Sequence, residues 1–270
     1  MGVGASNMSY ETILFNVDGG VATIALNRPE ALNALVPQMA EELADAMGRT
    51  QTDVAVRAVV VKGMGRVFSA GGDVKAFGEY LRADPQVALL ELAGHLHAGI
   101  VAIRRTPKPV VAQVHGVAAG AGMSLALACD LTIAADSARF MMAYTRVGLS
   151  PDGSSTYFLP RLVGFKKALE IFYIGDPIPA DEALRLGMVN RVVAEAALEE
   201  ETQALARRLA AGPTLAFGRA KELTYRSLHQ GLEVHLENER QYIARSGLTA
   251  DFREGVQALL EKREPKFSGR

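Results

Sequence analysis

Short β-rich runs alternate with helical patterns through the first half of this 270-residue chain. Four runs rich in Val, Ile or Ala are strand candidates, at 21–26, 57–63, 109–116 and 131–135. Strands that are separated by helices pair mainly in parallel and are buried beneath those helices. The alternation therefore predicts an α/β fold.

Two of the intervening stretches have the apolar spacing of amphipathic helices. The first repeats an apolar residue every four positions, at Leu35, Met39, Leu43 and Met47. The second, residues 86–104, places one apolar face on Leu89, Leu92, Ala93, Leu96 and Ile100. We expect both helices to pack against the sheet or against each other.

The alternation of strand and helix patterns gives way to mainly helical patterns after about residue 165. A short strand candidate, VNRVV, ends at residue 193, and residues 195–267 are helical by pattern. We predict a core of residues 1–195 and a C-terminal helical region of residues 196–270 that packs on a partner subunit.

Composition excludes several classes of function. The formal net charge is −1, which leaves no basic footprint for nucleic acid or for an anionic membrane. Cys129 is the only cysteine, so an internal disulfide is excluded and a reducing, cytoplasmic location is expected. We expect no stretch that is apolar enough, over sufficient length, to span a membrane.

Two segments concentrate small residues next to strands, GMGRVFSAGGDV at 63–74 and GVAAGAGMSLALACD at 116–130. Neither has the spacing of a P-loop or of a dinucleotide fingerprint. A helix that starts near Ala121 leaves its first N–H groups without partners. One N–H from each segment could hold an oxygen that becomes negative during a reaction. Tight packing of a helix on a sheet would need the same small residues.

Several long motifs occur in an order that is typical of one family. They are VATIALNRPEALNAL, VFSAGGDVKAF, HGVAAGAGMSLALACDL, FMMAYTRVGLSPDGSSTYFLPRLVG, ADEALRLGMVNRVV and EGVQALLEKREPKFSG. Through these motifs the chain resembles, nearly end to end, the crotonase superfamily of enoyl-CoA hydratases and isomerases. The resemblance implies a crotonase-like spiral of ββα units with a C-terminal helical trimerisation region, assembled as a homotrimer or a dimer of trimers.

The resemblance also implies an acyl-CoA substrate, held without a further cofactor or a metal ion. By motif, the two N–H groups of the family's oxyanion hole fall on Gly72 and on Ala121, where many relatives have glycine. The backbone that holds adenine and pantetheine in relatives corresponds here to Ala70, Gly71, Gly72, Asp73, Val74 and Lys75. Asp73 also precedes a helix that its side chain is expected to cap.

The chain departs from the family's hydratases at both of their catalytic glutamates. By motif these positions are Ser124 and Tyr144, which we expect to lie in the substrate pocket. A serine without an activator cannot replace a carboxylate base. Hydration of an enoyl-CoA is therefore not favoured.

Asp152, in GLSPD, supplies a carboxylate where isomerase branches of the superfamily carry theirs. The surrounding motifs look most like the phenylacetyl-epoxide-CoA isomerases, and Δ3,Δ2-enoyl-CoA isomerases carry SPE at this place. A double-bond shift needs one carboxylate to take and return a proton, with no water to activate. We therefore predict an isomerase with Asp152 as the acid/base, although Pro-Asp-Gly is also a common turn.

Three alternatives stay open from the residues. The first is a hydratase of weak or altered activity, and the second is a family member that binds acyl-CoA without turning it over. A serine hydrolase is the third, because GMSLA faintly resembles a nucleophile elbow at Ser124, followed by Asp152 and by His229 or His235. His95 and His97 are two apart on a predicted helix, so they point to different faces and are not expected to be ligands.

Overall fold

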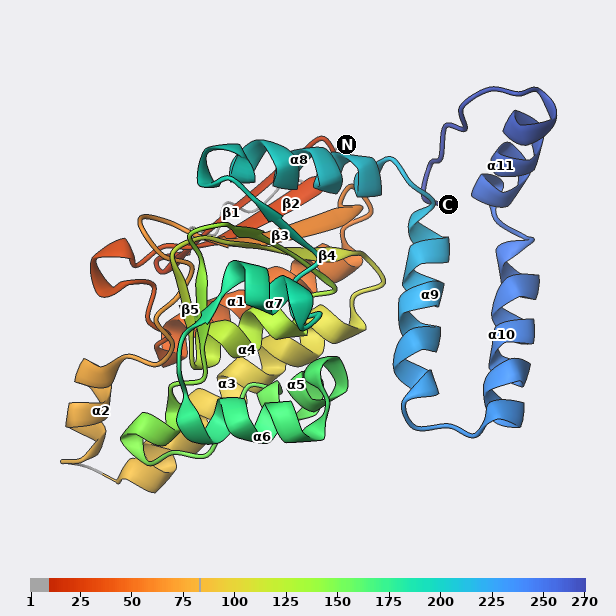
Figure 1. The fold of residues 1–270 in the computed structure, drawn as a ribbon. Helices are drawn as coiled ribbons and strands as arrows, with labels where there is room; N and C mark the ends of the chain where they lie inside the picture. The colour runs from red at the N-terminus through yellow and green to blue at the C-terminus, as the bar shows by residue number, and fades with distance from the viewer. Residues whose placement is uncertain (1–9, 83) are drawn as a thin grey trace.

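A six-stranded sheet and a smaller three-stranded sheet form the centre of the protein, whose computed structural model describes residues 10–82 and 84–270 (Figure 1). The strands are β1 (Ile13–Asp18), β2 (Val21–Leu26), β3 (Ala58–Gly63), β4 (Val110–Val114), β5 (Val117–Ala119), β6 (Leu131–Ala135), β7 (Arg139–Met141), β8 (Ile178–Pro179) and β9 (Arg191–Val193). The larger sheet has the order β1-β2-β3-β4-β6-β9, and the smaller has the order β5-β7-β8.

The α-helices lie on both faces of the larger sheet and beside it. They are α1 (Pro37–Thr52), α2 (Val74–Tyr80), α3 (Pro85–Arg105), α4 (Ala121–Ala128), α5 (Ser155–Val163), α6 (Phe165–Ile174), α7 (Ala180–Arg185), α8 (Leu198–Ala210), α9 (Thr214–Ser227), α10 (Leu232–Ser246) and α11 (Ala250–Leu260). In Figure 1, α8 lies on one face and α1 on the other, with α3 packed along α1. The predicted α/β class is confirmed.

The four strand predictions correspond to β2, β3, β4 and β6, and the short one corresponds to β9. These five strands pair in parallel, as expected for strands joined by helices. Sequence analysis did not identify β1, because Asn16 and Asp18 interrupt its apolar pattern. β1 pairs antiparallel to β2 through a turn at Gly19 and Gly20, which both have positive φ.

The two amphipathic predictions correspond to α1 and α3, but Leu35, predicted on the stripe of the first helix, lies before α1 and forms an isolated β-bridge with Gly72. Met39, Leu43 and Met47 of α1 are fully buried. In length and composition α3 would be able to span a membrane, so the expectation that no such stretch exists was wrong. This helix packs along α1 and buries Leu96 and Ile100, and its apolar side chains serve that packing and the cavity described below.

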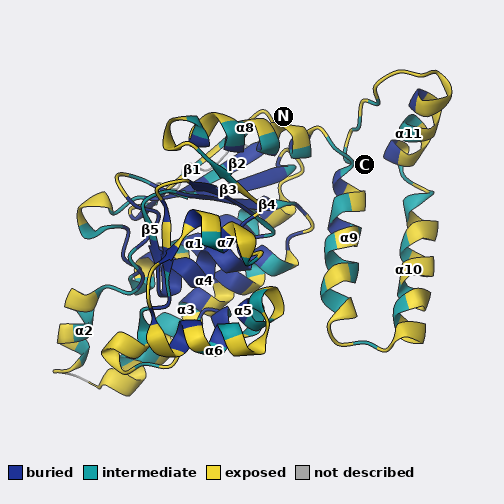
Figure 2. Cartoon of the chain, in the orientation of Figure 1, coloured by how far each residue is buried: buried dark blue, intermediate teal, exposed yellow. Residues whose placement is uncertain are grey.

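The C-terminal helices form two different environments. Ala206 and Ala210 of α8 are buried against strands β2 and β3, so α8 is part of the core. The helices α9, α10 and α11 lie beside that core, and α10 buries none of its residues within this chain (Figures 1 and 2). The division at residues 195 and 196, and assembly into trimers, stay predictions.

A lysine whose side chain is only 9% exposed joins α9 to the core. Lys221 Nζ donates hydrogen bonds to Asp130 Oδ2 at 2.8 Å and to the carbonyl of Ile103 at 2.7 Å. Burial lowers the pKa of Lys221, and the carboxylate of Asp130 opposes that shift. Lys221 therefore ties α9 to the segment after α4 through the ion pair, and to the end of α3 through the hydrogen bond to Ile103.

Candidate functional site

A largely apolar cavity of about 260 Å³ opens beside the small sheet. Its walls come from the two glycine-rich segments, from α2 and α3, and from the segment 143–152. The lining residues are Leu35, Ala70, Gly72, Val74, Phe77, Leu89, Leu92, Ala93, Leu96, Gly120, Ala121, Ala143, Tyr144, Val147, Leu149, Ser150 and Asp152. The apolar face predicted for α3 supplies four of them, so this helix is both a core element and a cavity wall.

The two glycine-rich segments touch at the cavity. Gly71 has a φ of +93°, and a Cβ added there would lie 2.7 Å from the carbonyl oxygen of Ala119 and 3.4 Å from the nitrogen of Ala121. Gly120 has a φ of +48° and lies against the Cα of Gly71. Glycine is needed at Gly71 because any side chain would push the two segments apart.

This close approach places the backbone of Gly72 and Ala121 side by side in the cavity wall. Within residues 10–82 and 84–270, neither of their N–H groups donates a hydrogen bond. Ala121 is the first residue of α4, where the helix dipole favours negative charge. The two residues predicted from sequence therefore both line the cavity, and their N–H groups have no acceptor within the described residues.

Asp73 begins α2 directly after Gly72. Its Oδ1 accepts a hydrogen bond from the N–H of Lys75 at 3.0 Å, and its Oδ2 lies 3.0 Å from Arg28 Nη2. Burial opposes ionisation of Asp73, but these hydrogen bonds outweigh it and hold its pKa below the usual value. The predicted helix cap is confirmed. In the segment proposed for CoA, Ala70, Gly72 and Val74 line the cavity.

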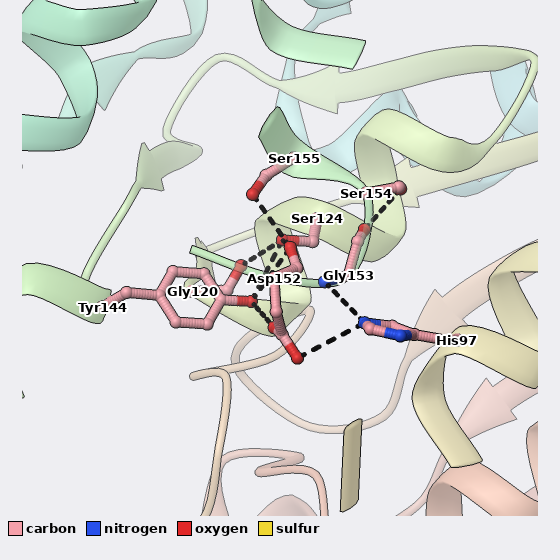
Figure 3. A network of polar contacts seen from close by, with 8 residues as sticks. All are labelled: His97, Gly120, Ser124, Tyr144, Asp152, Gly153, Ser154 and Ser155. Atoms are coloured by element: carbon pink, nitrogen blue, oxygen red, sulfur yellow. Dashed lines mark hydrogen bonds and ion pairs between the residues drawn. The ribbon is translucent and has the colours of Figure 1, made fainter. Parts of the chain in front are cut away.

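Asp152 both closes a turn and lines the cavity. Its backbone carbonyl accepts the N–H of Ser155 at 3.2 Å, across Gly153 and Ser154, which both have positive φ. A left-handed conformation at Ser154 is unusual for a residue with a Cβ and costs about 1–2 kcal/mol. The backbone of Asp152 makes the turn, and its carboxylate takes part in the separate contacts with Tyr144 and His97 that Figure 3 shows.

Tyr144 holds one oxygen of that carboxylate. Its hydroxyl donates to Asp152 Oδ1 at 2.5 Å (Figure 3). Burial, and then the negative charge of Asp152, raise the pKa of Tyr144 well above its usual value, so the phenol stays protonated. Oδ2 is the oxygen that Tyr144 leaves free.

Ser124 lies behind this pair and is fully buried. Its hydroxyl donates to the carbonyl of Asp152 at 2.9 Å and lies 3.1 Å from the hydroxyl of Tyr144. Its side chain is not among those that line the cavity, where we expected it, whereas Tyr144 is. Ser124 therefore supports the two side chains that reach the substrate space.

His97 is a neighbour of Asp152 that sequence analysis missed. Its Nε2 lies 3.7 Å from Asp152 Oδ2 and accepts the N–H of Gly153 at 3.4 Å (Figure 3). It follows Leu96 on α3, but helical spacing alone does not show which side chain meets a turn 55 residues farther along. No sequence signal marked it.

The residues of the hydrolase alternative are not brought together. Ser124 Oγ contacts the backbone of Asp152, whereas the carboxylate of Asp152 lies against Tyr144 and His97. His229 Nε2 contacts the hydroxyl of Tyr157, and His235 pairs with Glu239. A buried serine with neither histidine beside it has no base to activate it.

Comparison with known proteins identifies the family. The model of the family "Enoyl-CoA hydratase/isomerase" matches residues 16–270. A "probable enoyl-CoA hydratase" of Rhodobacter capsulatus is 43% identical over 266 residues, which cover 97% of this chain and 100% of the relative. The 1,2-epoxyphenylacetyl-CoA isomerase of Escherichia coli is 38% identical over 264 residues, 96% of this chain and 99% of that enzyme.

A solved structure of an enoyl-CoA hydratase from Polaromonas sp. JS666 superimposes with a TM-score of 0.91 at 36% identity, covering 94% of this chain and 99% of that one. The predicted crotonase-like fold is confirmed by this match. The relatives' names include both a hydratase and an isomerase, so the family match alone does not choose between the two reactions. The chain belongs to the enoyl-CoA hydratase/isomerase family, within the crotonase superfamily.

Proposed function

We propose that this protein shifts a double bond in an acyl-CoA thioester, with Asp152 as the single acid/base. One observation carries the proposal: among the described residues that line the cavity, Asp152 is the only carboxylate. Hydration requires one group to activate water and another to handle the α-proton. A double-bond shift requires only that one group take a proton and return it to another carbon.

The two glycine-rich segments would stabilise the intermediate. Removing a proton from the carbon next to a thioester makes an enolate, whose negative charge collects on the carbonyl oxygen. The N–H groups of Gly72 and Ala121 would donate to that oxygen. Loss of one such donor costs roughly 100- to 1000-fold in rate in a well-studied protease. Their lack of an acceptor within the described chain supports this role.

Asp152 would then move the proton. With Oδ1 held by Tyr144, Oδ2 takes the proton from C2 of a 3-enoyl-CoA and returns it to C4. Val147 and Leu149 line the cavity beside it, and an apolar surround limits the access of water to the enolate. The thioester would reach this point along the segment Ala70–Lys75, in which Ala70, Gly72 and Val74 line the cavity.

The experiment supplies a 3-enoyl-CoA and, separately, crotonyl-CoA to the purified protein, and follows absorbance and mass. We expect a double-bond shift without a gain in mass, and a loss of about 100-fold or more in Asp152→Asn. Asp18→Asn, an exposed carboxylate at the end of β1, is the matched control and should keep the parent's rate.

Two results would contradict the proposal. Addition of water to crotonyl-CoA at a rate comparable to any shift would make the protein a hydratase, with some group other than the two missing glutamates activating water. An Asp152→Asn protein that isomerises as fast as the parent would remove Asp152 from the reaction.

A further inference from the structure

We propose that His97 relays protons between Asp152 and solvent, so that hydrogen from water enters the product during the double-bond shift. This inference rests on the function proposed above and adds a second proton-carrying residue to the site. It is based on the position of the His97 imidazole, which lies against Oδ2 of Asp152.

The two oxygens of Asp152 have different neighbours. Oδ1 accepts the hydroxyl of Tyr144 at 2.5 Å, and Oδ2 lies 3.7 Å from His97 Nε2. Figure 3 shows Tyr144 and His97 approaching the carboxylate from opposite sides. The oxygen that is free to react with substrate is therefore also the one that faces the imidazole.

His97 is placed to accept a proton. Its Nε2 accepts the N–H of Gly153 at 3.4 Å, which requires a lone pair on that nitrogen. Distances between catalytic groups are often long without substrate and shorten when it binds. Once Asp152 Oδ2 carries the proton taken from substrate, a small rotation of either side chain would let that O–H donate to His97 Nε2 in place of the weak contact with Gly153.

The exposure of His97 to solvent completes the route of the proton from Asp152 to water. The side chain of His97 is 52% exposed, whereas that of Asp152 is 30% exposed and lies in the cavity wall. His97 does not line the cavity, so it would connect Asp152 Oδ2 to water from outside the substrate space. Imidazole is the group that enzymes use most often for such transfers.

The transfers balance without a further reactant. The C2–H bond of substrate breaks as the O–H bond on Asp152 Oδ2 forms. That O–H bond breaks as the N–H bond on His97 Nε2 forms, and the imidazolium gives a proton to water. The reverse steps bring a solvent proton back to Oδ2, which delivers it to C4. Direct return of the original proton from Asp152 competes with this route.

The test is isotopic. A 3-enoyl-CoA is turned over in heavy water, the reaction is stopped early, and mass spectrometry and NMR give the deuterium at C4 per double bond shifted. His97→Gln keeps an acceptor for the N–H of Gly153 but does not carry a proton. His95→Asn is the matched control, because His95 lies on the same helix and faces the carbonyl of Pro37 instead.

We expect the parent and His95→Asn to place deuterium at C4, and His97→Gln to place several-fold less deuterium there for each double bond that it shifts. Losing a positioned acid–base group slows the transfer that it catalyses by about 100-fold or more. An equal deuterium content in His97→Gln and the parent would overturn the relay. So would a parent protein that incorporates no deuterium at all.

Failure of the proposed function would look different. If the parent shifts no double bond, or Asp152→Asn shifts it at the parent's rate, the isomerase proposal falls. The relay is then read from exchange of the α-protons of butanoyl-CoA in heavy water, which needs no double bond. Slower exchange in His97→Gln than in His95→Asn supports the relay, and equal exchange overturns it.

Discussion

The cavity has two walls that are built from different parts of the chain. On one side, Gly72 and Ala121 present backbone N–H groups, and their side chains contribute almost nothing. On the other side, Asp152 and Tyr144 present side chains that hydrogen-bond to each other, and the buried hydroxyl of Ser124 donates to the backbone carbonyl of Asp152. One wall depends on the absence of side chains, and the other depends on which side chains are present.

The difference predicts how each wall fails. The backbone wall should be sensitive to any added Cβ and indifferent to charge. The side-chain wall should lose function in steps, as individual hydrogen bonds are removed from the carboxylate outward. Four substitutions test this contrast, in order of decreasing effect.

Gly71→Ala should have the largest effect on the backbone wall. The new Cβ would lie 2.7 Å from the carbonyl of Ala119 at a φ of +93°, so the two segments must separate. With the N–H groups misplaced, we expect the isomerisation rate to fall about 100-fold or more. Gly78→Ala, on the exposed side of α2 with open space around it, should keep the parent's rate. Equal rates for the two variants would show that the segments act independently.

Tyr144→Phe should lower the isomerisation rate less than Gly71→Ala does. It removes the donor to Asp152 Oδ1, and a hydrogen bond to a charged group contributes about 1.5–3 kcal/mol. We expect kcat to fall roughly tenfold, with little change in KM, because the carboxylate stays but is less well oriented.

The pH profile of the same variant checks the role of Tyr144. Since the pKa of Tyr144 is raised above its ordinary 10.0, the phenol remains a donor at every pH below that value, and its contribution is lost only as pH rises through the higher folded pKa. The ratio of parent to Tyr144→Phe rates should therefore be constant from neutral pH to 10.0. A ratio that collapses within that range would argue against a neutral phenol as the donor.

Asp73→Ala tests the support of the backbone wall. It removes the cap of α2 and the ion pair with Arg28, and a lost cap costs about 1 kcal/mol. Because the pKa of Asp73 is lowered, this stability is present above its ordinary 3.8 and is lost as pH falls through the folded pKa. Urea unfolding at neutral and acid pH measures the change.

Asp84→Ala is the matched control for that variant. Asp84 caps α3 through the N–H groups of Gln86 and Val87 and has no arginine partner in the part of the chain that the structure describes. We expect Asp73→Ala to lose more stability than Asp84→Ala at neutral pH. A larger loss in Asp84→Ala would show that the Arg28 pair contributes nothing measurable.

Ser124→Ala should have the smallest effect on catalysis. The carbonyl of Asp152 keeps the hydroxyl of Ser155 at 2.8 Å, so the turn retains one of its two serine donors. We expect a loss of about 1 kcal/mol in unfolding free energy and a rate within about twofold of the parent's. A loss as large as that of Asp152→Asn would mean that Ser124 takes part in the chemistry.

Much of the fold could be predicted because its signals are local. Apolar runs such as 57–63 and the spacing of Met39, Leu43 and Met47 are properties of neighbouring residues, and they located β3 and α1. The strands of the small sheet have two or three residues each, which is too short to produce a pattern. They pair only because the surrounding chain brings them together.

The functional site likewise has some features that the local sequence predicted and others that it did not. Runs of small residues marked both halves of the backbone wall, and the motif around Asp152 marked a carboxylate, because these features lie within short stretches of chain. The sequence alone could not assign the buried position of Ser124, the orientation of the two Asp152 oxygens or the approach of His97. Each depends on α3, α4 and the turn after Pro151 meeting in space, where packing determines which side chain each one faces.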